Sequence, residues 1–241
     1  MDSCRVRYSM KTSDENDELT SSNGGIGTIH VVSFDLEGTL LDMRFSEKVW
    51  NEGLPRLYAE KYKLDFSEAR NIVLREYARV GDERVEWYDL EYWFKRFGLS
   101  NPEGLLKAYR GFIQFFHETI DVLEKLSRKF KLIVITNSSR LFVNVLTDKI
   151  AHYFSRIFSA TSDFGLLKKN PESYQRICQA LNVKPWEMVH IGDRLQDDFE
   201  SPRNIGVKAY LLNRTENKNL APIKFTVKNL NEFANLLFTK I

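Results

Sequence analysis

Two periodicities of apolar residues follow one another along most of the chain. Short, β-rich apolar runs recur at intervals, and segments with an apolar residue at every third or fourth position lie between the later ones. The strand-like runs cover residues 29–34, 132–136, 157–160, 188–192 and 207–212, with a weaker run at 224–227. The helical patterns cover residues 119–129, 141–150, 171–181, 198–204 and 230–238. Strands that alternate with helices predict an α/β fold with a doubly wound parallel sheet, covered by helices on both faces.

Residues 43–116 interrupt this alternation with a helical pattern. Apolar residues recur there with the 3.6-residue period of a helix, and no run is typical of a strand. The segment holds Trp50, Trp87 and Trp93, three of the four tryptophans. We expect most of its aromatic residues to form the core of a small helical bundle. One or two of them could face the sheet and line a pocket, but the pattern does not say which.

The same patterns divide the chain into parts. We expect a core made of residues 28–42 and 117–241, with residues 43–116 inserted as a helical unit. Residues 1–27 are polar and lack a periodic apolar face, so they predict a flexible N-terminal extension.

Composition narrows the class of protein. The chain has 241 residues, with 35 basic against 33 acidic side chains and a net charge of +2, which argues against a nucleic-acid partner. No apolar run approaches the roughly 20 residues of a membrane span, so no membrane partner is expected. The two cysteines, Cys4 and Cys178, have no metal-ligand spacing and suit a reducing compartment. These features predict a cytoplasmic protein and leave its oligomeric state open.

The first strand-like run ends in two carboxylates. Asp35 and Glu37 are two residues apart and lead into the turn at Gly38 and Thr39. Side chains two apart on a strand share a face, and parallel sheets bind ligands at their carboxyl edge. Such a pair can hold a divalent cation, supply a nucleophile, or divide nucleophilic and acid–base roles. The alternative is a pair of acids that begin a solvated turn.

Two further groups follow later strands. Thr136 and Asn137 end the second run, where a hydroxyl and neighbouring N–H groups could bind a phosphate oxygen. Lys168 stands just ahead of a helix that is expected to start at Pro171, and its ammonium could offset the charge of a phosphate and of a carboxylate. Taken singly, each group is also explained by an ordinary strand end or a solvated loop.

The fourth group is an acidic strand end. The run at 188–192 leads into Asp193, and Asp197 and Asp198 follow one turn later. Carboxylates gathered at a strand end suit Mg²⁺, which takes oxygen ligands. One of the two later acids could instead serve as a favourable charge in the first turn of the next helix.

In this order and on these elements, the four groups resemble the motifs of the haloacid dehalogenase superfamily of hydrolases, and of its phosphatases in particular. The matching segments are residues 35–40, Thr136-Asn137, Lys168 with Asn170-Pro171, and residues 192–198. The resemblance spans residues 29 to about 214. It implies a Rossmann-like core, and residues 43–116 lie where the family inserts a helical cap.

The resemblance also implies roles for individual residues. Asp35 would attack phosphorus to form an aspartyl-phosphate, and Glu37 would act as general acid and then as general base. The implied phosphate-binding residues are Thr136, Asn137 and Lys168, and the implied Mg²⁺ ligands are Asp35, the Glu37 backbone carbonyl, Asp193 and Asp198. Spacing within the motifs favours Lys168 over Lys169 and Asp198 over Asp197.

Glu37 departs from the family pattern, because most of its phosphatases have Asp at this position. Glutamate keeps the acid–base chemistry but extends the carboxyl by one methylene. Dehalogenases of the family attack carbon without a metal and without a proton donor here, so the resemblance argues for phosphorus chemistry.

The sequence therefore predicts a Mg²⁺-dependent phosphomonoester hydrolase that acts on a small phosphorylated metabolite. A phosphomutase, a 2-haloacid dehalogenase and a non-catalytic binding module on the same fold are the alternatives. The substrate is not readable from the sequence. Arg79, Arg84 and the aromatic residues of 43–116 are candidates for its recognition.

Overall fold

A single six-stranded sheet organises the computed structural model, which describes residues 28–215 and 222–240. The strands are β1 (Val31–Phe34), β2 (Lys131–Thr136), β3 (Arg156–Ser159), β4 (Met188–Gly192), β5 (Lys208–Leu212) and β6 (Thr226–Val227). Their order is β3-β2-β1-β4-β5-β6, and every pairing is parallel. The predicted α/β fold is confirmed, and each predicted strand is present within a few residues of its expected ends.

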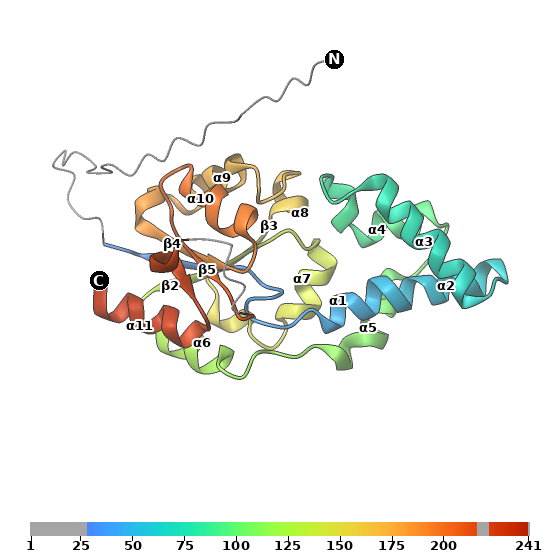
Figure 1. The fold of residues 1–241 in the computed structure, drawn as a ribbon, viewed down its shortest axis with the longest axis horizontal. Coiled ribbons are helices and arrows are strands. Elements are labelled where there is room, and N and C mark those ends of the chain that lie inside the picture. Colours follow the sequence, from blue (N-terminus) through green and yellow to red (C-terminus); the bar gives the residue numbers. More distant parts are fainter. Residues whose placement is uncertain (1–27, 216–221, 241) are drawn as a thin grey trace, which may run out of the picture.

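Helices cover both faces of the sheet (Figure 1). The α-helices outside the insert are α6 (Thr119–Ser127), α7 (Arg140–Thr147), α8 (Ala160–Phe164), α9 (Pro171–Leu181), α10 (Ser201–Arg203) and α11 (Leu230–Lys240). A π-helical segment, η6 (Leu195–Glu200), leads into α10, and short 3₁₀ turns lie at η4 (Ala151–Tyr153), η5 (Pro185–Glu187) and η7 (Ile223–Phe225). In Figure 1, α6 and α11 lie on one side of the sheet and α9 and α10 on the other.

The alternation of strand side chains builds two cores. Val32 and Phe34 belong to a large apolar cluster that includes Phe233 of α11, and the Phe34 and Phe233 rings meet edge to face with centroids 6.1 Å apart. Val31 points to the opposite face and belongs to a cluster with Ile177 of α9. The strand is buried along its whole length, which is typical of a central parallel strand.

Sequence signals at the ends of α9 explain its position. Asn170 caps the helix by accepting a hydrogen bond from the Glu172 N–H at 3.0 Å, and Pro171 occupies the first helical position. Asn182 ends the helix in the left-handed conformation with φ 53°. These signals fix the loop that carries Lys168 directly ahead of the helix.

Residues 44–112, which lie between β1 and α6, are helical and are called the helical insert below. It consists of α1 (Arg44–Lys48), the π-helical turn η1 (Val49–Gly53), α2 (Leu54–Tyr62), α3 (Phe66–Val80), η2 (Val85–Tyr88), α4 (Leu90–Arg96), α5 (Pro102–Tyr109) and η3 (Arg110–Phe112). Figure 1 shows these helices extending to one side of the sheet. No strand lies between β1 and β2 among the described residues, where only two isolated bridges occur.

The order of the strands places the carboxyl ends of β1 and β4 side by side. The chain runs outward from β1 to β2 and β3, then crosses back to β4 on the other side of β1. Open parallel sheets bind their ligands at such a switch point. The residues that follow these two strands are therefore positioned to form a site.

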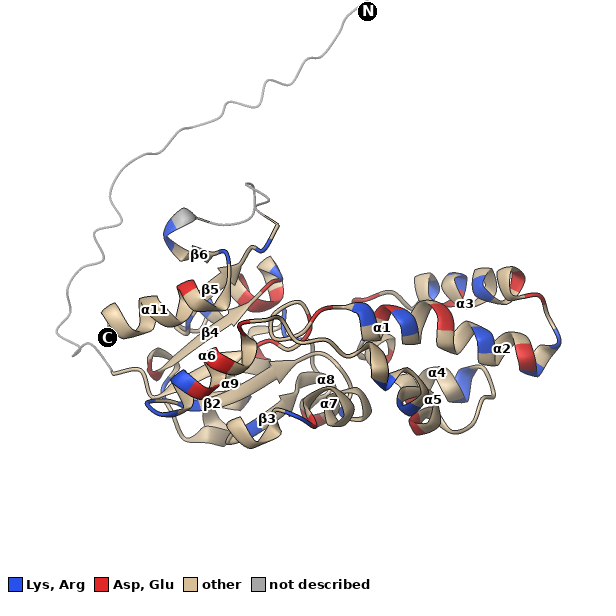
Figure 2. Ribbon diagram, turned by 90° about the horizontal axis from the view of Figure 1, so that it is seen from below, with Lys and Arg blue, Asp and Glu red and all other residues tan. Residues whose placement is uncertain are grey.

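Charged residues of both signs are interspersed over the molecule. Figure 2 shows Lys and Arg alternating with Asp and Glu along α1, α2 and α3 of the helical insert. Within the described part of the chain, no helix combines the length and the apolar character that a bilayer crossing requires. The predicted extension 1–27, including Cys4, lies outside the described residues, whereas Cys178 is buried in α9.

Candidate active site

Three predicted site residues come from neighbouring strand ends. Asp35 directly follows β1, and its N–H donates a hydrogen bond to the Ile191 carbonyl of β4 at 2.9 Å. Thr136 is the last residue of β2, and Asp193 directly follows β4. Because β1 lies between β2 and β4, the sheet brings these side chains to one edge.

Asp35, Asp193 and Asp198 form an acidic cluster. One carboxylate oxygen from each lies within 4.8 Å of the others. Asp35 and Asp198 are buried, and Asp193 is partly buried. Asp198 joins the cluster from η6, so the structure favours Asp198 over Asp197 as the third member, as the spacing predicted.

Two glycines allow these acids to approach the backbone. A Cβ atom on Gly38, whose φ is +84°, would lie 2.4 Å from Asp193 Oδ2. A Cβ atom on Gly192 would lie 2.3 Å from Asp198 Cγ. Any larger residue at either position would push a carboxylate out of the cluster, so both glycines are part of the site.

Lys168 lies between two of the three acids. Its ammonium is 2.6 Å from Asp198 Oδ1, and it also donates hydrogen bonds to Asp35 Oδ1 and to the Ile135 carbonyl, the latter at 3.2 Å. The Lys168 side chain is only 2% exposed. Burial opposes its charge, but the Asp198 and Asp35 carboxylates hold the pKa of Lys168 above its ordinary value. Lys169, by contrast, forms an ion pair with Glu83 of the helical insert.

The acidic cluster suits a divalent cation. Burial and the nearby Asp198 charge raise the pKa of Asp193 to about 6, and burial also raises the pKa of Asp35 despite the opposing Lys168 charge. Burial disfavours ionised Asp198 as well, but Lys168 and His190 hold its pKa below the usual range. Among the described residues, Asp193 Oδ1 is buried without a hydrogen-bond partner. A cation would satisfy that oxygen and favour the charged carboxylates, so the residues fit Mg²⁺.

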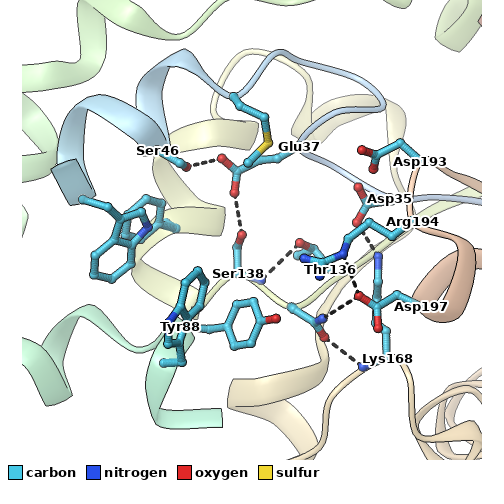
Figure 3. Close-up of a pocket in the computed structure, with 15 residues that line it drawn as sticks. Asp35, Glu37, Ser46, Tyr88, Thr136, Ser138, Lys168, Asp193, Arg194 and Asp197 are labelled. Carbon is cyan, nitrogen blue, oxygen red and sulfur yellow. Dashed lines mark hydrogen bonds and ion pairs between the residues drawn. The ribbon is translucent and has the colours of Figure 1, made fainter. Parts of the chain in front are cut away.

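Glu37 points toward the helical insert and is held by two serines (Figure 3). Ser46 of α1 donates a hydrogen bond to Glu37 Oε1, and Ser138, beyond β2, donates to Oε2 at 2.6 Å. Burial raises the pKa of Glu37, and the two serine hydrogen bonds oppose this shift. The carboxyl group thus favours its protonated form more than an exposed glutamate does, which suits a general acid.

Thr136 and Asn137 line the same cavity but differ in their contacts. Thr136 Oγ1 accepts a hydrogen bond from the Ser138 N–H at 3.2 Å. Asn137 Oδ1 accepts one from the Lys168 N–H at 2.8 Å, and its amide donates to Asp197 at 3.5 Å. The Asn137 side chain therefore holds the Lys168 loop in place, and its predicted contact with phosphate stays a prediction.

A buried layer beneath the acids was not predicted. His190 of β4 places Nδ1 2.7 Å from Ser33 Oγ, and its Nε2 lies 3.1 Å from both Asp198 Oδ1 and the Tyr174 hydroxyl. Tyr174 in turn donates to the Asp197 carbonyl at 2.7 Å. The strand alternation indicates that His190 faces α9, but no sequence signal indicated that its partners would be polar.

A cavity of about 380 Å³ opens above these groups. Its floor is formed by Asp35, Lys168 and Asp193, and its opposite wall is formed by aromatic side chains. Trp50, Trp87 and Tyr88 of the helical insert line it, together with Phe142 of α7. Three aromatic residues of the insert therefore line the cavity, where one or two were expected, while Trp93 is buried in the core of the insert.

The two arginines considered for substrate recognition lie elsewhere. Arg79 forms an ion pair with Glu76 at 2.6 Å, and Arg84 forms one with Glu86 at 2.6 Å. Neither arginine lines the cavity. The arginine that lines it among the described residues is Arg194, which pairs with Asp197 at 3.1 Å. Arg194 directly follows Asp193, so its position next to a predicted ligand could have identified it.

Comparison with known proteins agrees with this geometry. The model of the haloacid dehalogenase-like hydrolases matches residues 29–206. A glyceraldehyde 3-phosphate phosphatase of Pyrococcus furiosus is 26% identical over 75% of this chain and 79% of its own length. The (S)-2-haloacid dehalogenase 4A of Burkholderia cepacia is 27% identical over 88% of this chain and 96% of its own. The crystal structure of a haloacid dehalogenase-type (HAD) phosphatase from Thermococcus onnurineus superposes with a TM-score of 0.76 and 26% identity, covering 87% of this chain and 98% of that one.

Proposed function

This chain belongs to the haloacid dehalogenase-like hydrolases, and from that premise we propose that it is a Mg²⁺-dependent phosphomonoester hydrolase with Asp35 as its nucleophile. The observation that carries the proposal is the position of Glu37. Its carboxyl group lines the same cavity as Asp35 and is held there by Ser46 and Ser138. A leaving alkoxide needs a proton, and a buried carboxylic acid beside the nucleophile can supply it.

The reaction has two displacements at phosphorus. In the first, an Asp35 oxygen forms a bond to phosphorus as the bond to the ester oxygen breaks, and Glu37 gives its proton to the departing alkoxide. In the second, Glu37 as carboxylate takes a proton from water, and that water oxygen bonds to phosphorus as the aspartyl bond breaks. Inorganic phosphate and free Asp35 result, and Glu37 is again protonated.

Lys168 and Thr136 are the proposed contacts for the phosphoryl oxygens. The Lys168 ammonium already touches the nucleophile, so it lies where negative charge gathers in the transition state. The Thr136 hydroxyl lines the cavity at the end of β2. The Asn137 amide acts through the loop that it holds, by positioning Lys168.

The proposed ligands of Mg²⁺ are Asp35, the Glu37 backbone carbonyl, Asp193 and Asp198. The clustered carboxylates and the unpartnered Asp193 oxygen support this assignment. When bound there, the cation would offset the negative charge of the phosphoryl oxygens. We further propose that residues 43–116 act as a cap that encloses a small phosphorylated metabolite and limits access of water.

The dehalogenase relative keeps one alternative in view, in which Asp35 would attack carbon in place of phosphorus. Attack on carbon expels a halide, which needs no proton, so it would leave Glu37 and Asp193 without a use. A phosphomutase would employ the same residues but return the phosphoryl group to an organic acceptor. A binding module would bind phosphate without turnover.

The proposal is tested by hydrolysis of p-nitrophenyl phosphate with Mg²⁺ or with EDTA, by the native protein and by Asp35→Asn. We expect metal-dependent release of inorganic phosphate that falls at least about 10³-fold in the variant, with its fold kept. Chloride release from 2-chloropropionate, measured on the same samples, is expected to be absent. Chloride release without phosphatase activity would replace the proposal with dehalogenation, and Mg²⁺-dependent beryllofluoride binding without turnover would indicate a binding module.

A further inference from the structure

The cavity has chemically different ends. Asp35, Lys168 and Asp193 line the end where we propose that the phosphoryl group reacts, and Figure 3 shows Tyr88 on the side of the cavity away from Asp35 and Asp193. Trp50 and Trp87 line the cavity as well, and we place them with Tyr88 at the end that faces a leaving group. Each of these three aromatic side chains is partly exposed, although most apolar residues nearby are buried. The volume of about 380 Å³ is within the usual range of small-molecule sites.

The aromatic wall is held in place by packing. The Trp50 ring stacks on Phe142, with centroids 5.1 Å apart and planes at 8°, and meets Tyr77 edge to face at 5.9 Å. The Tyr77 hydroxyl donates to the Trp50 carbonyl at 3.2 Å. Trp87 meets Tyr88 edge to face at 4.9 Å, and its carbonyl accepts from the Trp93 indole at 3.1 Å. Because these side chains are already fixed by packing, ligand binding does not incur the entropy cost of ordering them.

Away from the acidic cluster, where Asp193 Oδ1 has no hydrogen-bond partner among the described residues, several polar side chains that line the cavity already make hydrogen bonds or ion pairs. Ser46 and Ser138 both bond Glu37, Asn137 bonds the Lys168 N–H, and Arg194 pairs with Asp197. A leaving group rich in hydroxyls would give up its hydrogen bonds to water and find few partners in return, which is costly. Within the described part of the chain, the Tyr88 hydroxyl makes one long hydrogen bond of 3.4 Å, to the Asp82 carbonyl, so it can serve one polar substituent.

Resting on the function proposed above, we infer that the preferred substrate is a phosphomonoester whose leaving group carries a planar aromatic or heteroaromatic ring. The ring stacks against Trp87 and Trp50 while its ester oxygen lies beside Glu37. Polyhydroxylated leaving groups are disfavoured because the wall offers rings in place of amides or carboxylates. Trp87 and Trp50 are then specificity-determining residues, with no part in the chemical step.

Three phosphates that all leave as primary alkoxides separate ring recognition from leaving-group reactivity. They are benzyl phosphate, cyclohexylmethyl phosphate and glycerol 3-phosphate, with release of inorganic phosphate as the readout. We expect kcat/KM for benzyl phosphate to exceed that of the other two at least fivefold. Cyclohexylmethyl phosphate controls for apolar volume, because it has a similar size without a planar ring.

Matched variants locate the effect. Trp87→Leu keeps an apolar side chain but removes the planar ring, and it should lower kcat/KM for benzyl phosphate about fivefold to tenfold, while glycerol 3-phosphate changes less than twofold. Trp87→Phe should restore most of the loss. Trp186→Leu is the control, because Trp186 is 56% exposed and does not line the cavity. Far-ultraviolet circular dichroism and the unfolding midpoint show that each variant folds.

The outcomes are distinguishable. A preference for glycerol 3-phosphate, or equal rates for the benzyl and cyclohexylmethyl esters, overturns the inference and leaves the phosphatase proposal standing. An equal loss on all three substrates in Trp87→Leu also overturns it, since that pattern indicates a structural role. Failure of the native protein to hydrolyse any of them, p-nitrophenyl phosphate included, overturns both.

Discussion

The Lys168 ammonium lies 2.6 Å from Asp198 Oδ1 and at the same time donates a hydrogen bond to Asp35 Oδ1, although its side chain is only 2% exposed. One cation therefore contacts two buried carboxylates, one that follows β1 and one from η6. Removing one partner of a buried ion pair leaves uncompensated charge, which typically costs 3–5 kcal/mol. This arrangement makes Lys168 important for folding as well as for turnover.

We predict that Lys168→Met lowers the free energy of unfolding by about 3–5 kcal/mol and kcat at least about 10²-fold. Urea unfolding and p-nitrophenyl phosphate hydrolysis measure the two effects. Lys169→Met is the matched control, because its partner Glu83 has a side chain that is 78% exposed. Exposed pairs contribute about 0–1 kcal/mol, so the control should differ little from the native protein. Similar losses in both variants would contradict this account of Lys168.

Glu37→Gln should affect substrates according to their leaving groups. An alkyl phosphate needs a proton on its leaving oxygen, which we propose that Glu37 supplies, so kcat should fall about 10²-fold or more, whereas p-nitrophenyl phosphate should lose much less. Steady-state kinetics on both esters give the comparison. Equal losses for the two esters would argue against acid catalysis by this residue.

The pH profile offers a separate test of Glu37. Burial raises its pKa, so the protonated acid persists to higher pH than in an exposed glutamate and is lost as pH rises through that raised pKa. The Ser138 hydroxyl donates to the carboxylate and opposes the rise, so Ser138→Ala should move the basic limb of kcat for an alkyl phosphate to higher pH. A limb that stays in place, or moves to lower pH, would contradict the role given to this hydrogen bond.

Asp193→Asn should stabilise the metal-free protein at neutral pH. The pKa of Asp193 is about 6 in the folded protein against an ordinary value of 3.8. The folded state therefore binds the proton more tightly, and the stability that this gives below about pH 4 is lost as pH rises through 6. The asparagine variant avoids that loss, so its free energy of unfolding should exceed the native value by roughly 1–3 kcal/mol at pH 7.5 and match it at pH 4.

Added Mg²⁺ should reverse the order of the two proteins. A cation that binds only the folded state raises the unfolding midpoint, and the variant has lost one of the proposed ligands. Asp82→Asn, which removes an exposed carboxylate, should follow the native protein with and without metal. An equal Mg²⁺ response in Asp193→Asn and native protein would move the metal site elsewhere.

Arg214 ties the loop after β1 to the end of the helical insert. Its guanidinium pairs with Glu118 at 2.7 Å, donates to the Thr39 carbonyl at 2.9 Å and lies 3.6 Å from the Phe116 ring centroid. We predict that Arg214→Met costs about 2–4 kcal/mol, because the buried Glu118 carboxylate loses its guanidinium partner and keeps only weaker contacts such as the Leu230 N–H at 3.3 Å. The double variant Glu118→Gln/Arg214→Met should cost less than the sum of the single changes in urea unfolding, whereas additivity would show that the two side chains act independently.

Much of the fold followed from local pattern. The strand that ends at Asp35 and the helix that begins at Pro171 are set by apolar periodicity and by capping, which act over a few residues. Asp198 is favoured over Asp197 because its five-residue offset from Asp193 matches the family motif, and the structure places Asp198 in the acidic cluster. These signals are short-range, so they are readable without knowledge of the tertiary structure.

The parts of the site that were not predicted from the sequence depend on contacts between distant segments. Ser46 and Ser138 meet at Glu37 only because α1 docks beside the end of β2. Trp50 and Trp87 line the cavity while Trp93 is buried, and this difference likewise depends on how the helical insert packs against α7. A sequence periodicity gives the buried side of a helix but not the partner that covers it, so these contacts could not be predicted.

Two wide helical turns border the cavity, Val49–Gly53 with Trp50 and Leu195–Glu200 with Asp198. Each residue of an α-helix turns the chain by about 100°, so deleting one residue from Val49–Gly53 would rotate α1 against α2 by about that angle. The helices could survive this change, but Trp50 would leave Phe142. Insertions and deletions should therefore be neutral in the surface loops of the insert. A homologue that has lost one residue from this turn should therefore keep the reaction chemistry but act on different substrates.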